Sequence, residues 1–510
     1  MTGPEEPTGE LLDEADDIFP DTAEPRAARR PITARGVALT SARVVTGAIG
    51  IAVAVAAIAG AALLPLPVLR SEPSSVVVVP VPTGQQLVCP GSILRLSDDT
   101  GQGATVSSAI GRATLRSFTT FGAVDSTPLA QSDAGTGDTP AAPTVVSTAP
   151  NPADPTEVIL ISGAQSQDAN EGDFVGLAAA GCATVSGDSW ISGGSTAVGR
   201  TTLLTLSNPT EVPATVDLEL FSERGAIAAP GTSGIVVPAS GQRVLSLAGF
   251  QPNMQMPVIH VTSVGGQVVA ELQQSIVRGL QPGGVDIVPA SAGPLLDSVI
   301  PGLVVVEPES VEALQGGGET FEDLRTVLRL FAPGEGTVST TISVVPEDGV
   351  GTGTSFALEI DAGRVTEVPI TDLAAGNYTV RVSASEPLIA SARVSTVSGD
   401  ASDFAWLSSA PLLSDQAVVT IAPGPGAQLH LANSSSEPIT VTLEASAGDD
   451  LTVDIGTGAA VSVDVQAGTS YELSGFADLH AAVSLSQGGK IAAYPVLPPG
   501  VGSSPVTIFP

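Results

Sequence analysis

Positive charge and aromatic side chains are scarce in this sequence. Its 510 residues include one lysine, 19 Lys plus Arg against 53 Asp plus Glu, and 3% aromatic residues, so the formal net charge is −34 at pH 7. A chain this acidic does not bind DNA or RNA through neutralisation of phosphates, and anionic lipid head groups and wall polymers repel it. The composition therefore argues against nucleic acid as a partner.

Cysteine and histidine are equally rare. Cys89 and Cys182 are the only cysteines, and His260, His430 and His480 are the only histidines. No two histidines have the short spacing of metal ligands, so a zinc site is not expected. No serine lies in a nucleophile-elbow motif. We therefore predict no catalytic residue, no metal and no cofactor.

Long apolar runs are absent from the sequence, with one exception. Val44–Leu64, VVTGAIGIAVAVAAIAGAALL, contains 21 residues without charge or proline. As a helix it would extend roughly 31 Å, the thickness of the hydrocarbon core of a bilayer. We predict a single transmembrane helix over this run.

The distribution of arginine gives the predicted orientation. Five arginines precede the run and one follows it closely: Arg26, Arg29, Arg30, Arg35 and Arg43 before it, and Arg70 after it. The positive-inside rule then places the N-terminus in the cytoplasm and the remainder outside. The alternative is a cleaved signal peptide, but its n-region would exceed 40 residues and its apolar core would be too long.

The flanking regions differ in composition. Residues 1–43 form an acidic and then Arg-rich tail, which we expect to be disordered and cytoplasmic. Residues 71–190 form a first β region that includes a Thr/Pro/Ala-rich insertion at 123–157, predicted to be a disordered loop. Cys89 and Cys182 both lie beyond the span, so we expect one disulfide between them. The alternative is two buried free thiols.

A strand–turn–strand pattern recurs three times in the remainder of the chain. Alternating strands flank turn residues in LLTLSNPTEVPATVDLEL from Leu203, VLRLFAPGEGTVSTTISV from Val327 and QLHLANSSSEPITVTLEA from Gln428. Three modules of about seven short strands each suit an immunoglobulin-like sandwich. The predicted modules are 191–295, 296–412 and 413–510. The alternative is three generic β segments that look alike through shared composition.

A second recurrence concerns a hairpin. Gly265-Gly266, Glu386-Pro387 and Gly488-Gly489 each lie between two alternating segments. Glycine pairs supply the positive φ that two-residue hairpins need. We therefore align these three turns with one another. The predicted fold is all-β: tandem immunoglobulin-like sandwiches on one N-terminal transmembrane helix.

Two residues are candidates for contact with a ligand or partner. Trp190 lies in GDSWISGGSTAVGR, where its ring is able to stack on a sugar, and Arg200 closes that stretch. The alternative for Trp190 is packing against the edge of a sandwich.

The same stretch carries a family resemblance. Trp190 with its WISGGST run, Gly199-Arg200, LTLSNP and ATVDLEL resemble a family of actinobacterial single-pass envelope proteins, a domain of unknown function. Cys89-Pro90-Gly91 and Cys182 fit the same pattern. The family's genes often lie near a large membrane glycosyltransferase, which implies a role in envelope glycan assembly. No catalytic residue is assigned in the family, so none is transferred.

Three hypotheses for the function follow. The first is a non-enzymatic, membrane-anchored scaffold or accessory protein of the bacterial envelope, whose partner is an envelope protein or a polysaccharide-assembly enzyme. The second is a glycan-binding module that uses Trp190 and Arg200. The third is an envelope enzyme in which two carboxylates act as acid and base.

Overall fold

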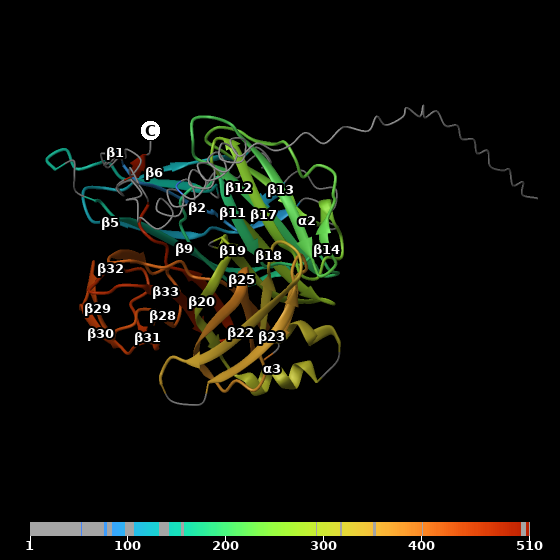
Figure 1. Ribbon diagram of the computed structural model, residues 1–510. Helices are drawn as coiled ribbons and strands as arrows, with labels where there is room; N and C mark the ends of the chain where they lie inside the picture. Colours follow the sequence, from blue (N-terminus) through green and yellow to red (C-terminus); the bar gives the residue numbers. More distant parts are fainter. Residues whose placement is uncertain are drawn as a thin grey trace, which may run out of the picture. The chain divides into compact units, whose positions relative to one another are not determined.

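The chain is all-β in the part that the structure describes, which confirms the predicted class (Figure 1). The computed structural model describes Val53 and residues 76–78, 84–96, 107–131, 142–154, 158–291, 293–316, 319–349, 353–399, 401–500 and 506–508. Apart from Val53, these residues belong to one unit, Val76–Ile508.

The predicted tail 1–43 and, except for Val53, the predicted span Val44–Leu64 lie outside the described residues. None of the helices described elsewhere in the chain is long and apolar enough to cross a membrane. These are α2 (Leu247–Phe250), α3 (Pro308–Gln315) and a 3-10 helix (Glu319–Leu324).

The last set of strands, set 3, gives the clearest view of the architecture. We name its strands A to H in chain order: β27 (Ala417–Thr420), β28 (Ala427–Asn433), β29 (Ile439–Ala445), β30 (Leu451–Ile455), β31 (Ala460–Asp464), β32 (Ser470–Ser474), β33 (Leu479–Gln487) and β34 (Lys490–Pro495). One sheet has the order A-F-C-D and the other E-B-G-H, all antiparallel. Both sheets contribute to one core that includes Leu431, Val441 and Leu473.

Set 1 repeats this strand order. Its strands are β11 (Asp188–Ser192), β12 (Arg200–Asn208), β13 (Ala214–Ser222), β14 (Gly225–Ile227) with β15 (Ile235–Val237), β16 (Gly241–Ser246), β17 (Val258–Gly265), β18 (Val269–Arg278) and β19 (Gln281–Pro289). The order is again A-F-C-D and E-B-G-H. In β13 the ATVDLELFS sequence alternates between buried and exposed residues along most of its length, as a half-buried strand requires.

Set 2 has the same order with one change. Its strands are β20 (Leu295–Val305), β21 (Val327–Phe331), β22 (Thr337–Pro346), β23 (Thr354–Asp361), β24 (Thr366–Pro369), β25 (Gly376–Ser398) and β26 (Ala401–Ser408). The first half of β25 pairs as strand F and the second half as strand G. One strand of 23 residues therefore joins the two sheets of set 2.

A fourth occurrence, set N, was not predicted from the sequence. Strands A, B, C, F, G and H are β2 (Gln86–Cys89), β5 (Thr114–Thr119), β6 (Asp125–Pro128), β8 (Thr144–Ser147), β9 (Ile161–Glu171) and β10 (Phe174–Gly181). They pair as A-F-C and B-G-H, as in the other sets. Figure 1 shows the four sets as groups that follow the colour sequence from blue to red.

The predicted insertion at 123–157 differs from the structure. It includes β6 and β8, and Val145 and Val146 in β8 are buried. The short strand β7 (Ala130–Gln131) in the same region pairs in parallel with β16 of set 1. Two further pairs lie outside the sets: β3 (Leu94–Leu96) with β4 (Ser107–Ala109), and β1 (Val76–Val78) with β35 (Val506–Ile508). Within 123–157, strands β6 and β8 therefore belong to set N and β7 pairs with set 1, which corrects the prediction of one disordered loop, while 132–141 and 155–157 lie outside the described residues.

The hairpin alignment predicted from the sequence is wrong in one of its three positions. Gly265-Gly266 lies between strands F and G of set 1, and Glu386-Pro387 lies at the same place within β25. Gly488-Gly489 instead lies between strands G and H of set 3, where set 1 has Gly279-Leu280. Paired glycines mark a tight turn but do not identify which strands it joins.

The four H strands bring the sets together. β10 lies beside β19, β19 beside β26, β26 beside β34, and β34 beside β10. Asp403 on β26 accepts hydrogen bonds from the backbone N–H groups of Leu177 (2.8 Å), Val285 (3.3 Å) and Ile491 (3.1 Å). These residues belong to sets N, 1 and 3, so one side chain of set 2 contacts all the other sets.

Close approach at this point requires glycine. Gly284 on β19 has φ of +114°, and a Cβ placed on it would lie 2.6 Å from Oδ1 of Asp403. Any other residue would both strain the backbone and collide with the carboxylate.

Candidate functional site

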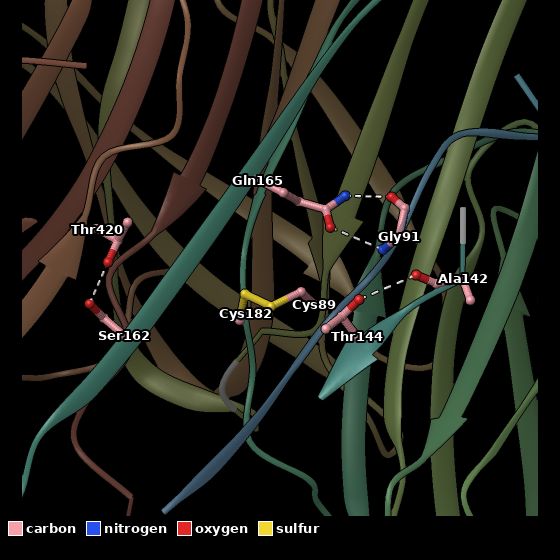
Figure 2. The surroundings of a disulfide bond; sticks show 8 residues. All are labelled: Cys89, Gly91, Ala142, Thr144, Ser162, Gln165, Cys182 and Thr420. Atoms are coloured by element: carbon pink, nitrogen blue, oxygen red, sulfur yellow. Dashed lines mark hydrogen bonds between the residues drawn. A yellow bond between two sulfur atoms is a disulfide. The ribbon is translucent and has the colours of Figure 1, made fainter. Parts of the chain in front are cut away.

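The predicted disulfide is present and lies in the core of set N. Sγ atoms of Cys89 and Cys182 are 2.04 Å apart, and both residues are buried with Leu87, Val146 and Ile161 (Figure 2). Cys89 ends strand A and Cys182 directly follows strand H. The bond therefore joins the two ends of the set.

The segment after Cys89 is fixed by a side-chain amide. Gln165 on β9 accepts a hydrogen bond from the N–H of Gly91 at 3.0 Å and donates one to its carbonyl (Figure 2). Gly91 has φ of +86°, which favours glycine at this turn. The Cys-Pro-Gly motif noted in the sequence is thus a turn locked against strand G.

The Trp190 ring is enclosed by other rings. Trp190 is 7% exposed and stacks on His260 with ring centroids 4.1 Å apart, while Phe221 and Phe331 lie near 6 Å. His260 also bonds to carboxylates of Glu219 (2.8 Å) and Asp188 (3.2 Å). His260 therefore covers one face of the Trp190 ring. Because Phe331 lies on β21 of set 2, this group of rings joins sets 1 and 2.

Arg200 belongs to a cluster of arginines between sets 1 and 2. Its Nη2 lies 2.9 Å from Oδ2 of Asp323, and Arg278 contacts both oxygens of the same carboxylate at 2.8 and 2.9 Å. Burial alone would raise the pKa of Asp323, but hydrogen bonding and charge from Arg278, with Arg393 and Arg200, hold it below its usual value. Trp190 and Arg200 thus both lie at this boundary, in separate contacts.

Arg329 makes a further contact between these sets. Leu328 and Leu330 face the core of set 2, so Arg329 between them points to the opposite face of the strand. Its guanidinium is 1% exposed, bonds to Glu367 at 2.6 Å and donates to the carbonyls of Gly194 and Pro257. It also lies 4.4 Å from the ring centroid of Trp406.

Sets 2 and 3 meet through a buried Glu–His–Ser chain that sequence reasoning missed. His430 lies 2.6 Å from Oε2 of Glu347 and 2.7 Å from Oγ of Ser484. Gly302 and Thr379 donate further hydrogen bonds to Glu347. Burial would raise the pKa of Glu347, but the charge and hydrogen bond of His430 lower it.

The Glu347–His430–Ser484 contact has the connectivity of a serine-hydrolase triad, but its serine is not exposed to solvent. Glu347, His430 and Ser484 are at most 1% exposed, and Ser484 lies on a central strand between β28 and β34. A substrate has no access to the hydroxyl, so the contact fixes set 3 against set 2. Of these three residues, only His430, within an alternating strand pattern, was singled out in the sequence.

The candidate ligand site is a cavity of about 330 Å³ between sets N and 1 and the C-terminal segment. Its walls come from the 183–189 connection, β18, the end of β19, and residues 495–500. This size lies at the lower end of the range of small-molecule pockets. The described lining includes eleven residues of Val, Leu, Ala and Pro, seven of them on β18, β19 and the C-terminal segment, and none of the described lining residues is basic.

Glu271 is the distinctive residue of this cavity. Ala270 and Leu272 on β18 face the core of set 1, so Glu271 faces the other way, towards set N. It is 2% exposed, and its Oε1 has no hydrogen-bond partner among the described residues. Burial raises the pKa of Glu271 to about 8. Asp188 is the other carboxylate in the lining.

The chain matches a protein-family model. A family model, described as a family of unknown function (DUF5719), matches residues 134–426. No curated protein matches the sequence. The matched region extends from strand F of set N to the end of strand A in set 3, so it includes the cavity wall formed by β18.

Proposed function

This chain belongs to the DUF5719 family of unknown function, and from that premise we propose a non-enzymatic, membrane-anchored scaffold or accessory protein of the bacterial cell envelope. In this proposal Val44–Leu64 crosses the membrane once and the N-terminus is cytoplasmic. The strand sets form extracytoplasmic sandwiches of immunoglobulin type. The partner is an envelope protein or a polysaccharide-assembly enzyme such as a membrane glycosyltransferase, as the actinobacterial resemblance implies.

The observation that carries the proposal is the way in which buried ionisable side chains join the sets. Asp403, Arg329 and His430 each bond across a boundary between sets while buried. Any other arrangement of the sets would separate these partners and leave a buried polar group uncompensated. The contacts therefore strongly favour one arrangement of the sets. A rigid surface of this kind suits a protein that positions partners.

The disulfide supports the extracytoplasmic part of the proposal. Cys89 and Cys182 are bonded, and disulfides persist in oxidising compartments but are rare in the cytosol. Protease added to spheroplasts should therefore digest residues 71–510 and spare the tail. Digestion of the tail alone would contradict this orientation.

The partner is tested by photo-crosslinking in intact cells. Leu280 is 96% exposed on the G–H turn of set 1, so a photoreactive residue there reports on what faces this set. A matched probe at exposed Glu359 on set 2 is the control. Capture of an envelope glycosyltransferase or polymer at one position supports the proposal. Absence of any envelope component at both positions counts against it.

A glycan-binding module is the first alternative, with Trp190 and Arg200 as the predicted contacts. In that case wall polysaccharide is retained by the purified chain and lost in Trp190→Ala. Because both side chains lie between sets 1 and 2, the variant must also unfold at the same denaturant concentration as the parent for the result to count.

A carboxylate-dependent enzyme is the second alternative, and one observation favours it. The cavity contains Glu271, whose pKa burial raises to about 8, together with Asp188. A protonated acid and a carboxylate that line one cavity are the kind of groups that general acid–base hydrolysis uses. Hydrolysis of wall polysaccharide by the purified chain, abolished in Glu271→Gln, would establish this alternative.

A further inference from the structure

At the cavity beside Glu271, one buried carboxyl oxygen lacks a hydrogen-bond donor. A buried carboxyl oxygen without a hydrogen-bond partner costs free energy unless another molecule supplies a donor. Oε1 of Glu271 is in that position among the described residues, and Glu271 is one of the residues that line the cavity. A molecule in the cavity would therefore lie beside Glu271.

The charges around the cavity define the donor. Of its two carboxyl groups, Asp188 bonds to His260 at 3.2 Å, whereas Glu271 has no Lys, Arg or His beside it in the described lining. The residues paired directly with Glu271 are not titratable, since they are Thr205 on β12 and Pro289 on β19. A neutral hydroxyl would satisfy the hydrogen bond alone, whereas a cation would satisfy both the bond and the charge.

The remainder of the lining defines what carries the cation. Val268, Ala290 and Leu497, with several prolines, form apolar walls, which suit an aliphatic stem that leads to a charged head. No aromatic side chain is in the described lining, so the cavity lacks the aromatic cage that quaternary ammonium groups prefer. A primary ammonium, with three donors, fits better.

We propose that this cavity binds a primary ammonium group on a short aliphatic stem and that the Glu271 carboxylate is its counter-ion. The ligand is either a free alkylamine or a lysine side chain of another molecule. The only lysine of this chain, Lys490, bonds to Asp168 at 2.5 and 2.6 Å. The inference goes beyond the proposed scaffold function and does not depend on the envelope location.

Binding is coupled to release of a proton. The buried carboxyl is protonated at neutral pH, because burial raises the pKa of Glu271 to about 8. When the ammonium enters, the carboxyl gives its proton to solvent and forms an ion pair. The amine itself, with a pKa of about 10.4, stays charged. Affinity should therefore rise about tenfold per pH unit from pH 6 to 7 and level off above pH 8.

The experiment is calorimetric titration of the detergent-solubilised full-length chain. Hexylamine is the probe, hexan-1-ol is its uncharged analogue, and a short lysine peptide represents a partner's side chain. Hexylamine or the peptide should bind at least about tenfold more tightly than hexan-1-ol, and buffers of different ionisation enthalpy should reveal close to one proton released. Which of the two amines binds identifies the source of the ligand.

Two variants address the site. Glu271→Gln keeps the shape and should weaken amine binding at least about tenfold and abolish the pH dependence. Gly293→Leu tests the cavity independently, since a Cβ at Gly293 meets nothing within 4 Å and this residue lines the cavity; it should also weaken binding. Glu359→Gln removes an exposed carboxylate elsewhere and should bind like the parent.

Three results would overturn the inference: no binding of either amine, equal binding of hexan-1-ol, or unchanged amine binding in Glu271→Gln. None of these bears on the crosslinking result. A captured envelope partner together with no amine binding would leave the proposed function intact, and amine binding without an envelope partner would leave only the cavity.

Discussion

At the residue scale, one asparagine arrangement closes the B–C turn in two sets. Asn208 accepts hydrogen bonds from N and Oγ1 of Thr210 (2.9 and 2.6 Å) and donates to the carbonyl of Val212 (2.8 Å). Asn433 makes the same contacts with Ser435 and Glu437 at 2.7–2.8 Å. Because both side chains are fully buried, these bonds replace water for several backbone groups at once.

Replacing either asparagine should therefore be costly. Asn433→Ala leaves the carbonyls of Glu437, Ile455 and Gly456 without this donor. We expect a loss of roughly 2–4 kcal/mol in the free energy of unfolding, measured by urea denaturation. Thr452→Ala on the exposed side of β30 is the control and should change stability by less than about 0.5 kcal/mol. Equal effects of the two changes would contradict the assignment.

At the element scale, the sets differ in how much core they contain. The core cluster around set 3 includes 24 buried residues, three of which come from set N (Ala164, Leu177 and Ala179), whereas the core around the disulfide includes five, two of which are the cysteines. A small core contributes little hydrophobic stabilisation. Covalent closure between the ends of set N therefore adds to the stabilisation that its packing supplies.

Removing the disulfide should therefore affect set N first. For the variant with both Cys89→Ala and Cys182→Ala, chain entropy predicts a loss of about 4–5 kcal/mol, since the cysteines are 93 positions apart. Amide hydrogen exchange should accelerate in β2, β8 and β9 and change least in β29 and β30 of set 3. Uniform acceleration across all sets would show that the bond stabilises the whole unit instead.

At the scale of the whole molecule, the four sets meet at a buried acid. Asp403 accepts hydrogen bonds from strands of three other sets. Burial nevertheless raises its pKa to about 8, and it raises the pKa of Asp286 as well. With Glu271, three interior carboxyl groups therefore bind protons more tightly in the folded chain than in the unfolded one.

The sign of the pH dependence follows from these shifts. A group whose pKa is raised on folding contributes stability that is complete below its unfolded value, near 4, and is lost as the pH rises through about 8. Each pKa unit corresponds to about 1.4 kcal/mol. The free energy of unfolding should therefore fall by several kcal/mol between pH 5 and 9.

Denaturant titrations across this range measure the effect. Glu271→Gln should flatten the fall by removing one of the groups, and exposed Glu359→Gln should leave it unchanged. Stability that rises steadily from pH 5 to 9 would contradict the raised pKa values. Below pH 4 stability should fall again, because Asp323 and Glu347 have lowered pKa values and their ion pairs are lost on protonation.

The sequence by itself determined the β class, the opening strand B and strand C of sets 1, 2 and 3, and the single cysteine pair. These features depend on local alternation and on the count of one residue type, which a sequence displays directly. Set N was not predicted from the sequence, because its strand B, Thr114–Thr119, does not alternate cleanly between buried and exposed residues.

Only the tertiary structure decided which turns correspond, what encloses Trp190, and that Glu271 lies on a cavity wall. Each depends on contacts between residues far apart in the chain: Phe331 against Trp190, or the 495–500 segment across from β18. The period of a strand specifies which side chains share a face, but not what packs against that face. Long-range packing therefore set both the site and its unpaired carboxyl oxygen.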